Sequence, residues 1–345
     1  MTLILLMKTY FSTSNPIIII VLCTILLSCG NNPLDIDVSD VKIDLTVKRF
    51  DQDLFKFTSD ITPKDVQELQ TKYGVFFHDF AESVINIGPI ENPNINYQLN
   101  SFAKDSYINE IKIDVSKNYS DFSPYQNELE NAFKHYKHYF PKKNIPIVIT
   151  YISGFNYAIT TDESYLGIGL DMFLGSNYDA YTQLGLPQYK TAFMSKDDLV
   201  IGAMLGWIST EFELKEKNAN LLAEMIHQGK IIYLLDALMP TIPNTIKMSY
   251  NENQLKWCDN NEEQVWFYFI DNDLLFTKEP TEIIKYMGEA PFIQGFPEGS
   301  PGRIGHWVGW QIVKAYMEKN PTVSIEKLML NDNAQQILNE SKYKP

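Results

Sequence analysis

The spacing of apolar residues changes along the chain, and each spacing predicts a different kind of element. Residues 41–57 alternate apolar and polar side chains, which predicts one or two strands. Thr62, followed by a proline, is a good capping residue for a helix that we expect to continue to about residue 85. A second helical pattern covers 124–140. The folded part of the chain is therefore predicted to begin with one or two strands, followed by two helices.

The apolar pattern then predicts a short sheet followed by many helices. Segment 144–154 predicts one strand, and 155–175 predicts two more, separated by turn residues. Ser195 begins a capping box of the S-x-x-D kind, which opens a helix at 199–210 that is apolar on nearly every face and should be buried. Further helices are predicted at 220–240, 261–276, 281–288, 301–320 and 323–330. This order predicts an α+β fold, mostly helical, in a single domain over 41–345.

The N-terminus has the pattern of a bacterial lipoprotein signal. Its apolar run, 16–27, is short for a membrane-spanning helix, which needs about 20 apolar residues. The run ends in the letters LLSC, which resemble a lipobox. We therefore predict a signal peptide at 1–28, lipidation of Cys29 and a tether at 29–40. The alternative is an uncleaved N-terminal anchor, and a start at Met7 would give a more usual signal.

The composition of the chain limits the kinds of partner that it can bind. The chain has 345 residues, 45% of them hydrophobic, so it can bury a large core. Its net charge of −14 offers no basic stripe to a nucleic acid and no attraction to anionic headgroups, so acyl chains must hold it at a membrane. Cys258 is expected to be a small buried hydrophobe. His135 and His138 have lysine neighbours, which disfavour a cation, and both are expected on a helix surface.

The order of elements, a sheet followed by a buried helix and then a second long helix, resembles that of zinc peptidases. In those enzymes an H-E-x-x-H motif on the first helix supplies two histidines and a general base, and a glutamate on the next helix completes the site. The corresponding positions here are Ala203, Met204, Trp207 and Gln228, none of which is a strong zinc ligand. We therefore expect a degenerate zincin-like domain without a metal or another cofactor.

A relocated metal site is the alternative. Glu224 and His227 lie one helical turn apart in the stretch LLAEMIHQGK, and they could share a metal with Glu211 or His306. A glutamate and a histidine on one helix are more often a solvated face or a hydrogen-bonded pair. The sequence also contains no nucleophile elbow, Walker loop or dinucleotide-binding glycine motif.

Segment 301–313 is a second candidate for a site. Three of its glycines fall at helical spacing beside two tryptophans, which favours the close approach of another element. Arg303 could instead bind an acidic group, in a groove that His306, Trp307 and Gln228 would share. Tight packing is the simpler interpretation of this segment.

Five blocks of sequence carry a resemblance to a known family. They are RFDQDLF, MIHQGKIIYLLDALMP, NEEQVWFYFIDNDLL, EAPF and, most specifically, SPGRIGHWVGWQIVKAYMEKNP. Together they resemble the gliding-motility lipoprotein family GldB over nearly all of the mature chain. The resemblance implies a bacterial cell-envelope lipoprotein required for gliding, with no established enzymatic activity. It also implies a distant similarity to predicted zinc peptidases, whose H-E-x-x-H this chain lacks.

These observations lead to one expected function and two alternatives. We expect a lipid-anchored, non-enzymatic envelope component that faces the periplasm and acts by contact with other gliding or secretion proteins, on either the inner or the outer membrane. One alternative is a metal-dependent peptidase or other hydrolase with a rearranged site at Glu224, His227 and His306. The other is a receptor for a peptide or glycan in an aromatic-rich cleft.

Replacing Cys29 tests the predicted anchor. Because the sulfur atom of Cys29 accepts the lipid, Cys29→Ala should abolish both incorporation of labelled fatty acid and cleavage of the signal. Autoradiography follows the label, and gel mobility follows the cleavage. Cys23→Ala, inside the same apolar run, is the matched control and should retain both. Undiminished labelling of the Cys29→Ala chain would contradict lipidation at this residue.

Overall fold

The computed structural model describes residues 32–215 and 219–345. Residues Asp37–Pro345 form one compact unit. The predicted signal peptide, Cys29 and the first two residues after it lie outside the described residues. No helix among the described residues is long and apolar enough to cross a membrane.

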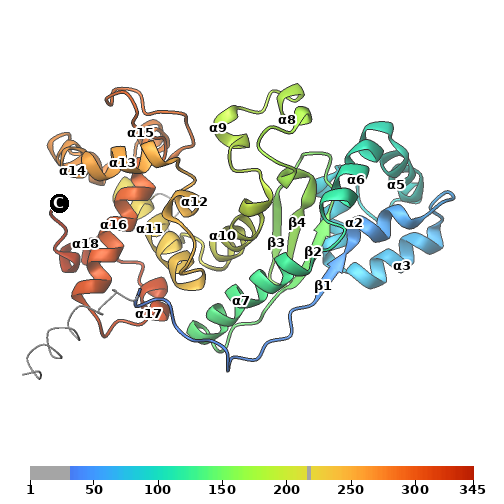
Figure 1. Cartoon of the computed structure of the whole chain (residues 1–345), viewed down its shortest axis with the longest axis horizontal. Coiled ribbons are helices and arrows are strands. Elements are labelled where there is room, and N and C mark those ends of the chain that lie inside the picture. The colour runs from blue at the N-terminus through green and yellow to red at the C-terminus, as the bar shows by residue number, and fades with distance from the viewer. Residues whose placement is uncertain (1–31, 216–218) are drawn as a thin grey trace, which may run out of the picture. The chain divides into compact units, whose positions relative to one another are not determined.

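Four short strands form one mixed sheet (Figure 1). They are β1 (Val47–Arg49), β2 (Ile147–Tyr151), β3 (Ile159–Asp162) and β4 (Tyr165–Gly169), in the order β1-β2-β4-β3. The first three strands in this order are parallel, and β3 pairs antiparallel with β4 at the edge. All five residues of β4 are buried, because it lies inside the sheet. The three strands predicted from 144–175 are confirmed.

The region before the sheet differs from its prediction in two places. After the short β1, the chain turns into α2 (Phe50–Asp53) and the 3-10 turn η1 (Leu54–Lys56), so 41–57 is mostly not strand. Phe50 explains the change, because its ring is fully buried against an aromatic cluster and meets Phe80 edge-on at 4.7 Å between ring centroids. The tertiary contact thus overrides the local alternation.

The helix predicted to continue to residue 85 is interrupted. Thr62 caps α3 (Pro63–Tyr73) as expected, and the side chain of Asp65 completes the capping box. Gly74 then has φ +56, a left-handed conformation that ends the helix. The chain resumes as α4 (Val75–Asp79) and a π-helical turn, η2 (Phe80–Val84).

Three helices connect this region to β2. They are α5 (Ile95–Lys104), α6 (Ser106–Asn118) and α7 (Ser123–Tyr139). The α7 prediction is confirmed, whereas α5 and α6 were not predicted. His135 was wrongly expected on a surface: it is 3% exposed, with a ring nitrogen 3.0 Å from the Asn131 carbonyl oxygen. His138 is exposed as expected.

The rest of the chain is helical, which confirms the predominance of helices in a mostly helical α+β fold. Its elements are η3 (Leu170–Phe173), α8 (Asp179–Gln183), α9 (Gln188–Thr191), η4 (Lys196–Asp198), α10 (Leu199–Glu211), α11 (Leu221–Leu238), α12 (Asn244–Met248), α13 (Glu252–Asn260), α14 (Glu262–Asp271), η5 (Leu274–Phe276), α15 (Pro280–Met287), α16 (Ile304–Lys319), α17 (Ile325–Leu330) and α18 (Ala334–Ser341). The Ser195 capping box is present before α10, and Cys258 is fully buried. The short helices α8, α9, α12, α13 and α18 were not predicted.

Helices α11 and α16 pack with their backbones in contact. A Cβ atom added to Gly309 of α16 would lie 1.8 Å from the Met225 carbonyl oxygen of α11. A Cβ added to Gly229 of α11 would lie 2.3 Å from the Gly309 carbonyl carbon. Gly302 and Gly305 are equally tight, against Ala290 and Met287. The expectation that these glycines allow another element to approach closely is confirmed.

A buried polar group joins the same two helices to α12. The Asp236 carboxylate of α11 pairs with the Lys247 ammonium at 2.8 Å and accepts a hydrogen bond from the Trp310 indole at 2.6 Å. Burial raises the pKa of Asp236, and Lys247 opposes that rise. Because Lys247 and Trp310 both pair with Asp236, removing any one of the three would leave a buried charge or an unpaired buried donor.

Gly309→Ala tests the close contact of α11 and α16. The new methyl group would overlap the Met225 carbonyl, so we expect the free energy of unfolding to fall by at least about 2 kcal/mol in a urea titration followed by circular dichroism. Gly202→Ala on α10 is the control, because its Cβ would lie 3.4 Å from the Phe173 ring. There the better helix propensity should leave stability unchanged or raise it by up to about 1 kcal/mol. Equal stabilities of the two variants would contradict the contact.

Candidate functional site

Helix α10 occupies the place where the order of elements would put a zinc-binding pair. Ala203 and Met204 are fully buried, and Trp207 is 2% exposed. The Trp207 ring packs edge-on against Phe133 of α7, with the ring centroids 6.3 Å apart. These side chains fill the space between α10 and its neighbours, and none of them is a usual zinc ligand.

Glu211 and His227 line one cavity of about 410 Å³, together with three lysines and two further acids, Glu213 and Asp332. Glu211, at the end of α10, accepts a hydrogen bond from the Tyr136 hydroxyl at 2.8 Å and pairs with Lys143. The glutamate therefore already has two partners. The three ammonium groups and three carboxylates of this cavity balance one another, so no net negative charge attracts a metal cation.

Glu224 and His306 are held by other surroundings. Glu224 is half-buried, and burial raises the pKa of its carboxyl group. The His306 Nε2 atom lies 3.1 Å from the Met287 carbonyl oxygen. Within residues 32–215 and 219–345, no three His, Cys, Asp or Glu side chains form a group able to hold a metal. The structure thus does not assemble Glu224, His227 and His306 into one ligand set.

Both central histidines are kept neutral by their surroundings. Burial, helped by the positive charge of Lys230, lowers the pKa of His227 from 6.5 to about 4. Burial and then Arg303 lower the pKa of His306 to about 3. Since desolvation disfavours the charged imidazolium, both rings are neutral near pH 7.

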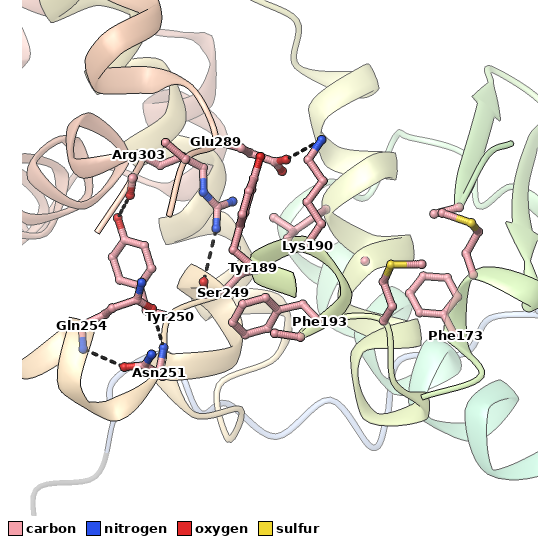
Figure 2. A pocket seen from close by; sticks show the side chains of 18 of the residues that line it. Phe173, Tyr189, Lys190, Phe193, Ser249, Tyr250, Asn251, Gln254, Glu289 and Arg303 are labelled. Carbon is pink, nitrogen blue, oxygen red and sulfur yellow. Dashed lines mark hydrogen bonds and ion pairs between the residues drawn. The ribbon is translucent and has the colours of Figure 1, made fainter. Parts of the chain in front are cut away.

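A second cavity, of about 440 Å³, lies where Arg303 begins α16 (Figure 2). Its lining comes from β3, η3, α9 and α10 and from the segments around 249–254 and 289–303. The Arg303 guanidinium donates hydrogen bonds from Nη2 to the carbonyl oxygens of Met248, at 2.8 Å, and Ser249, at 3.4 Å. Those bonds hold the guanidinium in place beside the cavity.

The predicted groove is therefore present only in part. Arg303 lines this cavity, but Gln228, His306 and Trp307 are not among the lining residues. Trp307 is 1% exposed and belongs to the core between α11 and α16, so its assignment to a groove is corrected to packing. Arg303 precedes the helix with φ +56, and its guanidinium is held by the carbonyl oxygens of Met248 and Ser249.

Several lining residues of this cavity were not found from the sequence. Lys190 of α9 and Glu289 form an ion pair of 3.2 Å at its edge, and both side chains are about half exposed. Asn251 and Gln254 form a capping box at the start of α13. The N-x-x-Q spacing of that box could have been found in the sequence, whereas no local pattern links Lys190 to Glu289.

The fold and these sites define a mostly helical α+β protein whose described residues contain no assembled group of metal donors. The family model described as gliding motility protein GldB matches residues 31–345. The chain therefore belongs to the GldB family, which implies involvement in gliding motility. No curated protein and no solved structure matches it.

The lowered pKa of His306 predicts a pH dependence of stability. The unfolded chain binds a proton near pH 6.5, but the folded chain does so only near pH 3, so this residue's contribution is complete above pH 6.5 and is lost as the pH falls. From pH 7 to pH 4.5, wild-type stability should therefore fall by about 2 kcal/mol relative to His306→Gln, whose amide can still donate to Met287.

Urea unfolding of both chains at each pH measures this difference. The control for the substitution itself is His138→Gln at the exposed histidine of α7. A difference between wild type and His306→Gln that stays constant over this pH range would contradict a buried, neutral His306.

Proposed function

We propose that this chain is a lipid-anchored, non-enzymatic component of the gliding apparatus, which acts by binding other envelope proteins. Membership of the GldB family supports the role in gliding. The lipobox ending at Cys29 supports an anchor that places the folded domain on the periplasmic face of a membrane. The partners in this proposal are other proteins of the gliding or secretion machinery.

One observation carries the non-enzymatic part of the proposal. The positions at which a zinc peptidase would hold its ligands and general base are taken by Ala203, Met204 and Trp207, all of them packed in the core. Restoring a site there would require both new donors and space for an ion with a water molecule. The buried α10 has no such space, because its side chains fill it.

The alternative, a metal-dependent hydrolase, is favoured by the cavity that Glu211 and His227 share. A neutral histidine and a carboxylate are both good ligands for zinc. Elemental analysis of the purified full-length chain separates the two functions. We expect substoichiometric zinc, and near-stoichiometric zinc would favour the hydrolase.

Motility of cells carrying single variants tests the proposal directly. If no chemistry depends on α11, Glu224→Ala and Gln228→Ala should both leave gliding speed and colony spreading close to wild type, whereas Cys29→Ala should stop movement. Immunoblots of each strain check that the variants are present at equal amounts. Loss of gliding in Glu224→Ala at normal abundance would count against a purely binding role.

A further inference from the structure

The cavity beside Arg303 has two chemically different walls. Its apolar wall is built by η3, α10 and the chain after α9, and it includes Phe173, Met194 and Leu205. Its polar wall is built by the segments around 249–254 and 289–303. Figure 2 shows Phe173 on one side of the space and Arg303, Asn251 and Gln254 on the other. A ligand of this cavity must therefore be amphipathic.

The polar wall offers mainly hydrogen-bond donors. In the capping box at α13, the Asn251 carbonyl oxygen accepts from the Gln254 backbone and the Gln254 carbonyl oxygen accepts from the Asn251 backbone, each at 2.9 Å. Those bonds engage each side-chain oxygen once, and both amide nitrogens remain as donors. Arg303 uses only Nη2 for its bonds to the Met248 and Ser249 carbonyls, so the Nε and Nη1 atoms of the guanidinium remain as further donors.

The charged residues that line the cavity also favour an anionic ligand. Two cationic residues, Lys190 and Arg303, and one anionic residue, Glu289, line it, although the chain as a whole carries −14. An anchored guanidinium is well suited to a carboxylate, which can take two parallel hydrogen bonds. The Lys190–Glu289 pair is half exposed, and such pairs contribute little stability, so a ligand can displace it.

The apolar wall suits a single large side chain. Phe173 is 4% exposed and Met194 is 8% exposed, so the wall is firmly part of the fold. Methionine is flexible and polarizable, which allows the wall to adapt to apolar groups of different shape. The cavity volume of about 440 Å³ lies within the range of small-ligand sites.

We propose that this cavity binds the free C-terminus of a partner polypeptide whose last residue is apolar. The α-carboxylate pairs with Arg303, and the last side chain packs against Phe173, Met194 and Leu205. The amide donors of Asn251 and Gln254 meet carbonyl oxygens of the preceding residues, and Glu289 accepts a backbone N–H. A fatty acid would satisfy the carboxylate but would leave those amides and Glu289 unused, which favours the peptide. This inference rests on the proposed function in binding other envelope proteins.

Fluorescence anisotropy with the full-length chain in detergent tests the site. The probes are labelled hexapeptides of a Gly-Ser repeat that end in leucine, isoleucine, methionine, phenylalanine, tyrosine or tryptophan, each made as the free acid and as the amide. At least one free acid should bind at micromolar to submillimolar concentration, and its amide should bind roughly tenfold more weakly or worse, because the amide lacks the charge that pairs with the guanidinium.

Two variants check the place of binding. Leu205→Glu puts a negative charge into the apolar wall and should weaken the free acid by roughly tenfold or more. Leu330→Glu is the matched control, since Leu330 is 65% exposed on α17 and does not line this cavity. Lys190→Met should weaken binding less than Leu205→Glu, because the exposed ammonium is screened by water. Thermal unfolding of each variant confirms that it is folded.

Three outcomes would overturn the proposal. They are no binding of any free acid up to about 1 mM, equal binding of acid and amide, and displacement of the peptide by octanoate at the same concentration as by unlabelled peptide. None of these results bears on anchoring or on motility, which are measured in cells with Cys29→Ala and Glu224→Ala. A failed peptide assay beside the expected motility result would remove the ligand and leave the proposed function standing.

Discussion

The contact between α11 and α16 is the constraint on which the C-terminal half of this protein depends. Two buried helices can bring their backbones together only where side chains are absent, and Gly229 and Gly309 provide that absence at the crossing point. The same contact brings Trp310 to Asp236 and sets the start of α16, with Arg303, beside the second cavity. Packing at the crossing therefore determines where the polar groups lie.

Several buried polar groups in this protein are paired with one another, and this has a consequence for chemistry. Asp236 pairs with Lys247 and accepts a hydrogen bond from Trp310, Glu211 pairs with Lys143, and the ammonium of Lys230 donates to the Asn331 carbonyl at 2.8 Å. Groups engaged in this way stabilise the fold but are poor candidates for binding an ion. On α10, the side chains of Ala203, Met204 and Trp207 contribute volume to the core.

The two cavities differ in how their charges are arranged. Around Glu211 and His227 the lysines are paired or buried, so that cavity is largely compensated internally. At Arg303 the fixed guanidinium, the two amide nitrogens and a weak surface ion pair leave binding capacity available on one wall.

The sequence by itself determined the features that depend on residues close together along the chain. The lipobox pattern, the capping boxes at Thr62 and Ser195 and the apolar helix at 199–210 follow from local spacing, and the five sequence blocks carry the family resemblance. Only the tertiary structure decided that Phe50 leaves the strand pattern, that His135 is buried, and that Lys190 meets Glu289. The physical reason is that caps and periodicity act over about four residues, whereas a cavity forms where segments distant in sequence are brought together by packing.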